Sequence, residues 1–163
     1  MKVFTVTQKI ISLTATYDVR NEGSDEIIKT IRGKMLTISP RLEMKEGKDK
    51  DGTPLAKLHG NYLKTKFKIF GRDKEEAASL KFPALSFLPT FRMTVNGITY
   101  KAKSKLLSNK MTVKDESGNE VFYITKNYTF RDKFTVAIDE QIPDDIGILC
   151  AVAIDQKYYQ KKN

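Results

Sequence analysis

The chain has 163 residues, of which 40% are apolar and 30% are charged, and its formal net charge is +9. This balance excludes an intrinsically disordered chain, and the length predicts one domain that buries roughly two-thirds of its unfolded surface without a disulfide or a metal. Cys150 is the only cysteine, and the opening "MKVFTVTQK" lacks the features of a secretion signal. We therefore expect a single domain over residues 1–163 in the cytoplasm.

A repeated pattern runs along most of the chain. Six times, a polar or proline-containing bend precedes apolar residues at every second position: "KIISLTATYDV", "KMLTISPRLEM", "NYLKTKFKIF", "ALSFLPTFRMTV", "KLLSNKMTV" and "NYTFRDKFTVAI". The period is about 21 to 27 residues. Polar residues such as Asp18, Lys68 and Arg92 fall between the apolar ones. This alternation is typical of a half-buried β-strand, so the chain contains six such strands.

Turn sequences follow five of these strands and predict a returning partner for each. They are "RNEGSDE", "GKDKDGTP", "GRDKEE", "VNGI" and "DESGNEV", in which glycine allows the chain to reverse. The returning strands include "EIIKTIRG", "PLAKLHG", "AASLKF", "GITYKAKSK" and "EVFYITKN". Counting "MKVFTVTQ" as the first strand, we expect about twelve strands in all.

The stretch "DDIGILCAVAI" at residues 144–154 is the most apolar of the sequence. Its uncharged part, residues 146–154, would span only about 14 Å as a helix, which is too short to cross a bilayer. Asp144 and Asp145 suit the N-cap and first turn of a helix, whereas Gly147 and the branched residues would also allow a strand. Either element would have to be enclosed by the rest of the protein.

The two patterns together predict one architecture. A sheet of twelve antiparallel strands must close to remove its edges, and a barrel of this size is too wide for its own side chains to fill. We therefore predict a mainly β fold in which a closed barrel encloses a helix at about residues 145–155. Leu149, Val152 and Ile154 are expected among its packing residues, followed by a basic tail at 156–163.

These segments also resemble a known family. The stretch "DESGNEVFYITKNYTFRDKFTVAI", followed by an acidic turn and "DDIGILCAVAID", is similar to the LURP-one-related family of the tubby C-terminal-like superfamily. Phospholipid scramblases are more distant members of that superfamily. The resemblance extends from about Gln8 to Asp155, and it implies a twelve-stranded barrel around a central hydrophobic C-terminal helix.

Residues suited to catalysis are few. His59, the only histidine, precedes a glycine at the end of a predicted strand, and we interpret it as a turn or surface residue. Cys150 lies among apolar residues, which favours a core role over a nucleophilic one. The "DKDG" stretch lacks the rest of a calcium loop, and no glycine-rich phosphate loop is present. We therefore predict no catalytic residues, no metal site, no cofactor and no enzymatic activity.

Positive charge is the remaining signal, and it favours anionic partners. Two alternating series predict ladders on the outer face of the barrel: Lys64, Lys66 and Lys68, and Lys101, Lys103 and Lys105. The predicted ligand is an anionic phospholipid headgroup, as the resemblance also suggests. The alternative is that these lysines only keep the surface soluble.

Two hypotheses of function follow. The first is a non-enzymatic binding module, monomeric and peripheral to an anionic membrane surface. The second is a structural or protein-interaction domain without a lipid ligand. Nucleic-acid binding is weakly supported, because the outward lysines are not interleaved with exposed aromatic residues for base stacking.

Overall fold

The structure, a computed structural model, describes residues 1–11, 14–34, 37–49, 51–85, 90–104, 109–127 and 132–159. In these residues the chain forms twelve strands and one α-helix that continues into a turn of π-helix. The strands are β1 (Lys2–Ile11), β2 (Thr14–Asn21), β3 (Lys29–Gly33), β4 (Arg41–Glu46), β5 (Ala56–Gly60), β6 (Lys66–Phe70), β7 (Glu76–Lys81), β8 (Thr90–Val95), β9 (Ile98–Ser104), β10 (Lys110–Lys114), β11 (Glu120–Lys126) and β12 (Lys133–Ile138). The helices are α1 (Asp144–Ile154) and η1 (Asp155–Tyr159).

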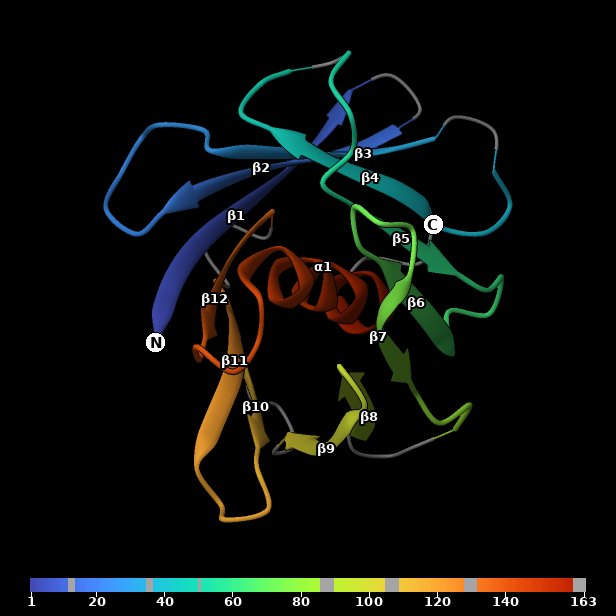
Figure 1. The fold of residues 1–163 in the computed structure, drawn as a ribbon, viewed down its shortest axis with the longest axis vertical. Coiled ribbons are helices and arrows are strands. Elements are labelled where there is room, and N and C mark those ends of the chain that lie inside the picture. The colour runs from blue at the N-terminus through green and yellow to red at the C-terminus, as the bar shows by residue number, and fades with distance from the viewer. Residues whose placement is uncertain are drawn as a thin grey trace.

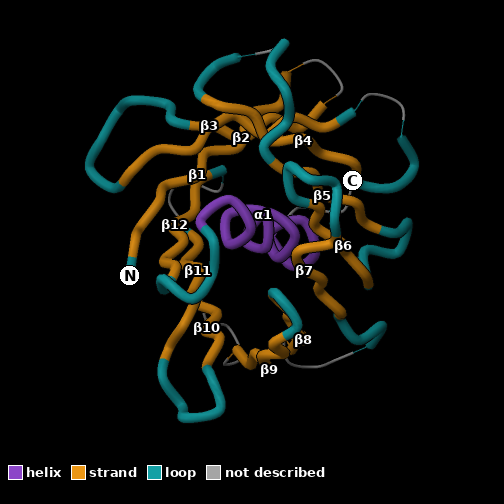
Figure 2. The backbone as a smooth tube through the Cα atoms, in the orientation of Figure 1, coloured by secondary structure: helices purple, strands orange, loops and turns teal. Residues whose placement is uncertain are grey.

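The strands form a closed antiparallel barrel. Each strand pairs with the next in the sequence, and β1 also pairs with β12, with Phe4 opposite Val136, so the sheet has no free edge. Figure 1 shows α1 in the middle of this ring of strands, and the tube in Figure 2 shows the same enclosure. The predicted mainly β barrel around a C-terminal helix is therefore confirmed.

The alternating sequence pattern produces the two faces of the barrel wall. On β6, Phe67 and Ile69 are buried whereas Lys66 and Lys68 are exposed. Every residue of α1 from Ile146 to Ile154 is buried, including the predicted Leu149, Val152 and Ile154. The most apolar stretch of the sequence is therefore buried because it fills the space that the twelve strands enclose. Among the helices of the described chain, none has the length and apolar character that crossing a bilayer requires.

The start of α1 differs from the prediction in one respect. Asp144 and Asp145 lie in the first turn, but Pro143 occupies the N-cap and no side chain caps the helix. The two carboxylates instead form ion pairs with the barrel wall, Asp144 with Lys2 at 2.8 Å and Asp145 with Lys29 at 2.6 Å. These pairs attach the start of the helix to β1 and β3.

Gly147, which could have indicated a strand, is required by close packing inside the barrel. A Cβ at this position would lie 2.5 Å from Cδ1 of Ile138 on β12, and 3.0 Å from its Cγ1 and Cγ2. The glycine therefore lets α1 approach β12 more closely than any other residue would allow.

We expect Gly147→Val to lower the free energy of unfolding by about 1–3 kcal/mol, because the added atoms would overpack the core. The midpoint of urea unfolding measures this effect. Gly33→Val is the matched control, since the nearest atom to a Cβ there is the Ala15 carbonyl oxygen at 3.5 Å. Equal midpoints for the two variants would contradict the packing role of Gly147.

The barrel has two ends that differ in chemistry. We call the end at which α1 begins the N end, and the end at which α1 stops the C end. The N end carries the connections 22–28, 47–55, 71–75, 96–97, 115–119 and 139–143. The described parts of the C-end connections are 34, 37–40, 61–65, 82–85, 109, 127 and 132, together with η1.

Candidate functional site

The first predicted lysine ladder is only partly present. Lys66 and Lys68 lie on β6 and are exposed on the outer face, as predicted. Lys64 is not on the strand, so its predicted position was wrong. It lies in the connection from β5 to β6 with a φ of 53°, and it is half-buried. Burial, and after it the charge of Lys157, lowers the pKa of Lys64 below its ordinary value.

Asn61 explains why the strand begins after Lys64. Its Oδ1 accepts hydrogen bonds from the backbone N–H groups of Thr65 and Lys66, at 2.8 and 2.9 Å, and its Nδ2 donates to the Thr65 hydroxyl at 2.8 Å. An asparagine that binds the backbone ahead of it in this way holds a tight turn, which ends the alternation expected of a strand.

The remaining predicted lysines also differ from one another in their surroundings. Lys68 pairs with Glu76 on β7 at 3.4 Å, so its charge is partly compensated. Lys101 is exposed on β9, and Lys103 occupies the position opposite Thr90 in the register. Lys105 lies outside the described residues. The first predicted ladder is therefore reduced to Lys66 and Lys68, whereas Lys101 and Lys103 of the second share β9 as predicted.

Basic residues also form a row that crosses neighbouring strands. Lys66 on β6 is opposite Lys81 on β7, and Lys81 is opposite Arg92 on β8. Arg92 is opposite Lys101 on β9, which is in turn opposite Lys114 on β10. We call Lys66, Lys81, Arg92, Lys101 and Lys114 the basic row.

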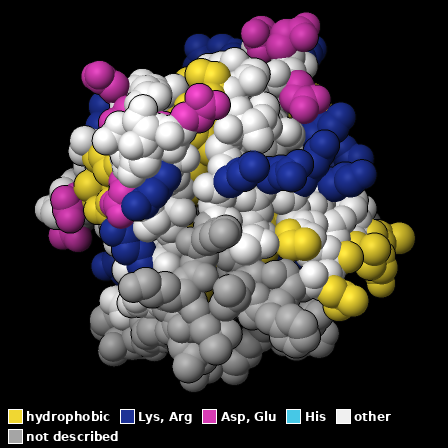
Figure 3. Space-filling view, turned by 90° about the horizontal axis from the view of Figure 1, so that it is seen from below, with side chains coloured by type: hydrophobic (Ala, Val, Ile, Leu, Met, Phe, Trp, Pro, Cys, Tyr) yellow, Lys and Arg dark blue, Asp and Glu magenta, His cyan; other side chains and the backbone are white. Residues whose placement is uncertain are grey.

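All five side chains of the basic row are exposed. Five adjacent strands at a spacing of about 4.8 Å place these charges along about 19 Å of the barrel surface. Figure 3 shows a band of Lys and Arg side chains crossing one face of the molecule. The row ends at β11, where the residue opposite Lys114 is Glu120.

The members of the basic row lack counter-charges among the described residues. Some lysines elsewhere in this part of the chain form ion pairs, for example Lys29 with Asp145 and Lys57 with Glu43, whereas others, such as Lys48 and Lys74, form none. No ion pair within this part of the chain involves a member of the row. Like charges directly opposite each other on adjacent strands destabilise a sheet. The row therefore carries a cost that a bound anion would remove.

A hollow of about 470 Å³ lies next to the middle of the row. Its lining includes the cations Lys81, Arg92 and Lys101, and the remaining lining residues are Phe82, Pro83, Thr90, Phe91 and Ala102. An arginine can bind two oxygens of a phosphate at once, and the two lysines add charge-assisted hydrogen bonds. The arrangement is therefore suited to a phosphate with an apolar portion beside it.

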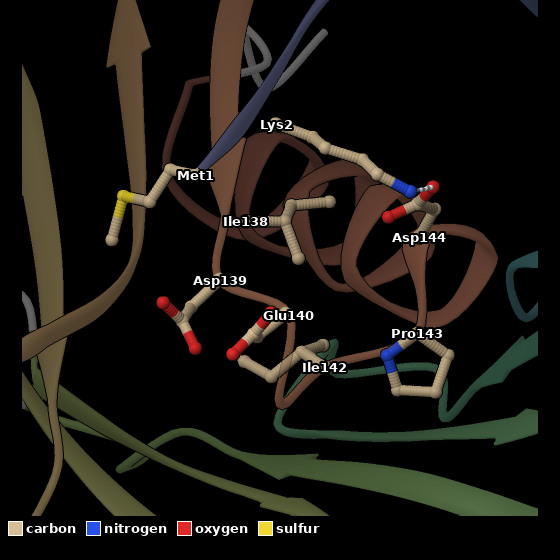
Figure 4. Close-up of a pocket in the computed structure, with 8 residues that line it drawn as sticks. All are labelled: Met1, Lys2, Ile138, Asp139, Glu140, Ile142, Pro143 and Asp144. Atoms are coloured by element: carbon tan, nitrogen blue, oxygen red, sulfur yellow. Dashed lines mark hydrogen bonds and ion pairs between the residues drawn. The ribbon is translucent and has the colours of Figure 1, made fainter.

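The hollow at the N end has the opposite character. It also measures about 470 Å³, and its lining includes Asp139, Glu140 and Asp144 with Lys2. Figure 4 shows Lys2 reaching Asp144, with which it pairs at 2.8 Å, while Asp139 and Glu140 lie on the chain segment that leads to α1. Its net negative charge would repel an anion.

The two residues weighed for catalysis, His59 and Cys150, lie in different surroundings. Arg41 donates from Nη1 to Nδ1 of His59 at 2.9 Å, so the ring proton of a neutral His59 lies on Nε2. Burial, and after it the charge of Arg41, lowers the pKa of His59. Cys150 is buried in α1, where burial raises the pKa of its thiol and keeps it protonated. The described residues contain no group of three or more His, Cys, Asp or Glu side chains suited to a metal ion.

Sequence reasoning missed three members of the basic row. The sequence pattern marks Arg92 only as a polar residue between apolar ones and Lys81 only as part of a strand, and Lys114 falls between the predicted strand and the turn that follows it. None of the three belongs to a run of lysines at every second position of its strand, so no local pattern marks it. The row depends on the register, that is, on which residues of adjacent strands lie opposite each other. Alternation along one strand does not determine this register.

Comparison with protein families identifies a match over most of the chain. The family model described as LURP-one-related matches residues 2–155, which includes the whole barrel and α1. No curated protein matches the sequence.

Proposed function

The chain belongs to the LURP-one-related family, and we propose that it is a non-enzymatic module that associates reversibly with anionic phospholipid headgroups through the basic row. The observation that carries this proposal is the alignment of five exposed cations on five neighbouring strands. Each basic residue close to an anionic membrane surface contributes about 1 kcal/mol to binding. A row of five is therefore sufficient for a peripheral and reversible association.

The alternative, a structural or protein-interaction domain whose lysines only provide solubility, accounts less well for the row. Lysines often protect the edges of open sheets, but this barrel is closed and has no edge to protect. Solubility is best served by charges of both signs interspersed over the surface. The row instead places five cations side by side without a carboxylate between them.

The proposal also includes where the protein acts. Anionic phospholipids give the cytoplasmic leaflet a negative surface potential, which falls off within a Debye length. We propose a monomer that exchanges between the cytoplasm and this leaflet without a cofactor.

Vesicle sedimentation tests the proposed function. We expect the protein to sediment with vesicles that contain phosphatidylserine and to remain in the supernatant with vesicles of phosphatidylcholine alone. Raising the salt concentration to about 1 M, where the Debye length is about 3 Å, should release it. Equal sedimentation with both kinds of vesicle, or none with either, would reject the proposal and favour the protein-interaction alternative.

A further inference from the structure

The C end of the barrel presents large apolar side chains to solvent. Six large hydrophobic residues of the described chain are markedly exposed, and four of them lie in connections at this end: Ile38, Tyr62, Leu63 and Leu85. Leu85 is 94% exposed and Leu63 is 68% exposed. A cluster of exposed apolar side chains on one end of a soluble domain typically marks an interaction site.

These apolar residues adjoin the basic row. Tyr62 and Leu63 lie in the connection that leads into β6, whose first residue is Lys66. Leu85 follows β7, whose last residue is Lys81. Because Lys66 and Lys81 are opposite each other in the register, the two apolar connections extend from the same end of one strand pair. Figure 3 likewise shows hydrophobic side chains gathered below and to the right of the band of basic ones.

Charge distinguishes the two ends as clearly as hydrophobicity does. The N-end connections carry eleven carboxylates: Glu22, Asp25, Glu26, Asp49, Asp51, Asp73, Glu75, Asp115, Glu116, Asp139 and Glu140. Their described residues include only three cations, Lys48, Arg72 and Lys74. The described residues of the C-end connections and η1 carry two carboxylates, Asp132 and the buried Asp155, which pairs with Lys126. In Figure 3, acidic side chains lie mainly along the upper and left edges, away from the hydrophobic side chains at the right.

We propose that the C end of the barrel is the part that enters the membrane. The connections that carry Tyr62, Leu63 and Leu85 insert between headgroups, the part of the basic row nearest this end, beginning with Lys66 and Lys81, contacts phosphates beside them, and the acidic N end faces the aqueous phase. This inference rests on the proposed function and adds to it the orientation of the barrel and a hydrophobic contribution to binding. Cations bordering apolar side chains match the boundary between headgroups and acyl chains.

The combination of charges favours a bilayer over other occupants of this surface. A soluble phosphate would use the basic row but would leave the apolar connections in water. A second copy of the chain would cover the apolar connections but would bring two basic rows together, which charge repulsion opposes. Of these three occupants, only an anionic bilayer satisfies both features at once.

A single tryptophan provides the test, because the chain has no native tryptophan. Leu85→Trp places the fluorophore at the C end, and Ile98→Trp, at a position that is 56% exposed, places it at the N end. Both positions are exposed, so both variants should fold, and unchanged thermal unfolding would verify this. With phosphatidylserine vesicles we expect a blue shift for the Leu85→Trp variant, and quenching by brominated acyl chains. The Ile98→Trp variant should show neither.

The remaining outcomes separate this inference from the proposed function. If both variants sediment with anionic vesicles but neither is quenched, insertion of the C end is rejected while headgroup binding stands. If quenching occurs only at position 98, the orientation is reversed and the inference is wrong. If neither variant sediments, the proposed function itself fails. A blue shift of the Leu85→Trp variant that grows with protein concentration without vesicles would show that a second copy covers this end, which would also overturn the inference.

Discussion

Lys126→Met is expected to lower the free energy of unfolding by about 3–5 kcal/mol, the range found when one partner of a buried ion pair is removed. Lys126 lies at the end of β11, and its Nζ is 2.5 Å from Oδ1 of Asp155, which follows α1 directly. The two side chains are 7% and 0% exposed. The lysine also lies over the ring of Phe134, 5.4 Å from its centroid. Removing the ammonium would therefore leave a buried carboxylate without its counter-ion.

Two further variants show whether the lost stability comes from the ion pair or from the removal of any lysine. The free energy of unfolding in urea is measured for both. Lys68→Met removes a lysine from an exposed pair with Glu76, and such pairs contribute at most about 1 kcal/mol. Adding Asp155→Asn to Lys126→Met removes the buried charge and should recover part of the lost stability. Similar losses for Lys126→Met and Lys68→Met would contradict a specific role for the buried pair.

The buried pair also connects stability to the candidate site. It attaches the last turn of α1 to the barrel wall at the C end, where η1 begins. Further along η1, the Tyr158 hydroxyl donates to the backbone carbonyl of Thr90 on β8 at 3.0 Å, and its ring packs against Phe82. Phe82 and Thr90 line the hollow beside the basic row. The central helix therefore supports the surface that we propose contacts lipid.

The barrel could be predicted from the sequence because its determinants are local. Residues such as Phe67 and Ile69 alternate with Lys66 and Lys68, and this period of two decides which side chains face the core. The enclosed helix followed from one physical requirement, that an apolar run too short for a bilayer must be covered by protein. Both predictions are confirmed, as is membership of the LURP-one-related family. The wider relation to the tubby C-terminal-like superfamily stays an expectation from resemblance.

The candidate site could be predicted only in part, because it depends on contacts between strands. The sequence predicts Lys66 and Lys101 as site residues, but their neighbours in the row come from other strands, and only the register places Lys81 and Arg92 between them. Lys64 was misplaced because the side chain of Asn61 continues the turn by several residues. Local alternation cannot show such a competing hydrogen bond.

Reversing two charges in the middle of the basic row should strongly reduce membrane association. The double variant Arg92→Glu with Lys101→Glu removes two adjacent cations from the hollow of about 470 Å³ and adds two anions. At about 1 kcal/mol for each cation near the surface, the loss of attraction alone is about 2 kcal/mol. This corresponds to a decrease of roughly thirtyfold in the partition coefficient, and repulsion by the new carboxylates would add to it.

A matched variant controls for the change in total charge. Arg72→Glu with Lys48→Glu also reverses one arginine and one lysine, and both residues are exposed in connections at the N end. Our account places this end away from the membrane, so the control should bind nearly as well as the unmodified chain. Circular dichroism and thermal unfolding should be unchanged in both double variants, because all four side chains are exposed.

The most direct measurement is the ratio of the partition coefficients of these two double variants on the same phosphatidylserine vesicles. If the basic row is the membrane-contact surface, the N-end variant should bind at least about thirtyfold more tightly than the row variant. A ratio close to one would mean that only the total charge matters, and it would contradict the assignment of the basic row.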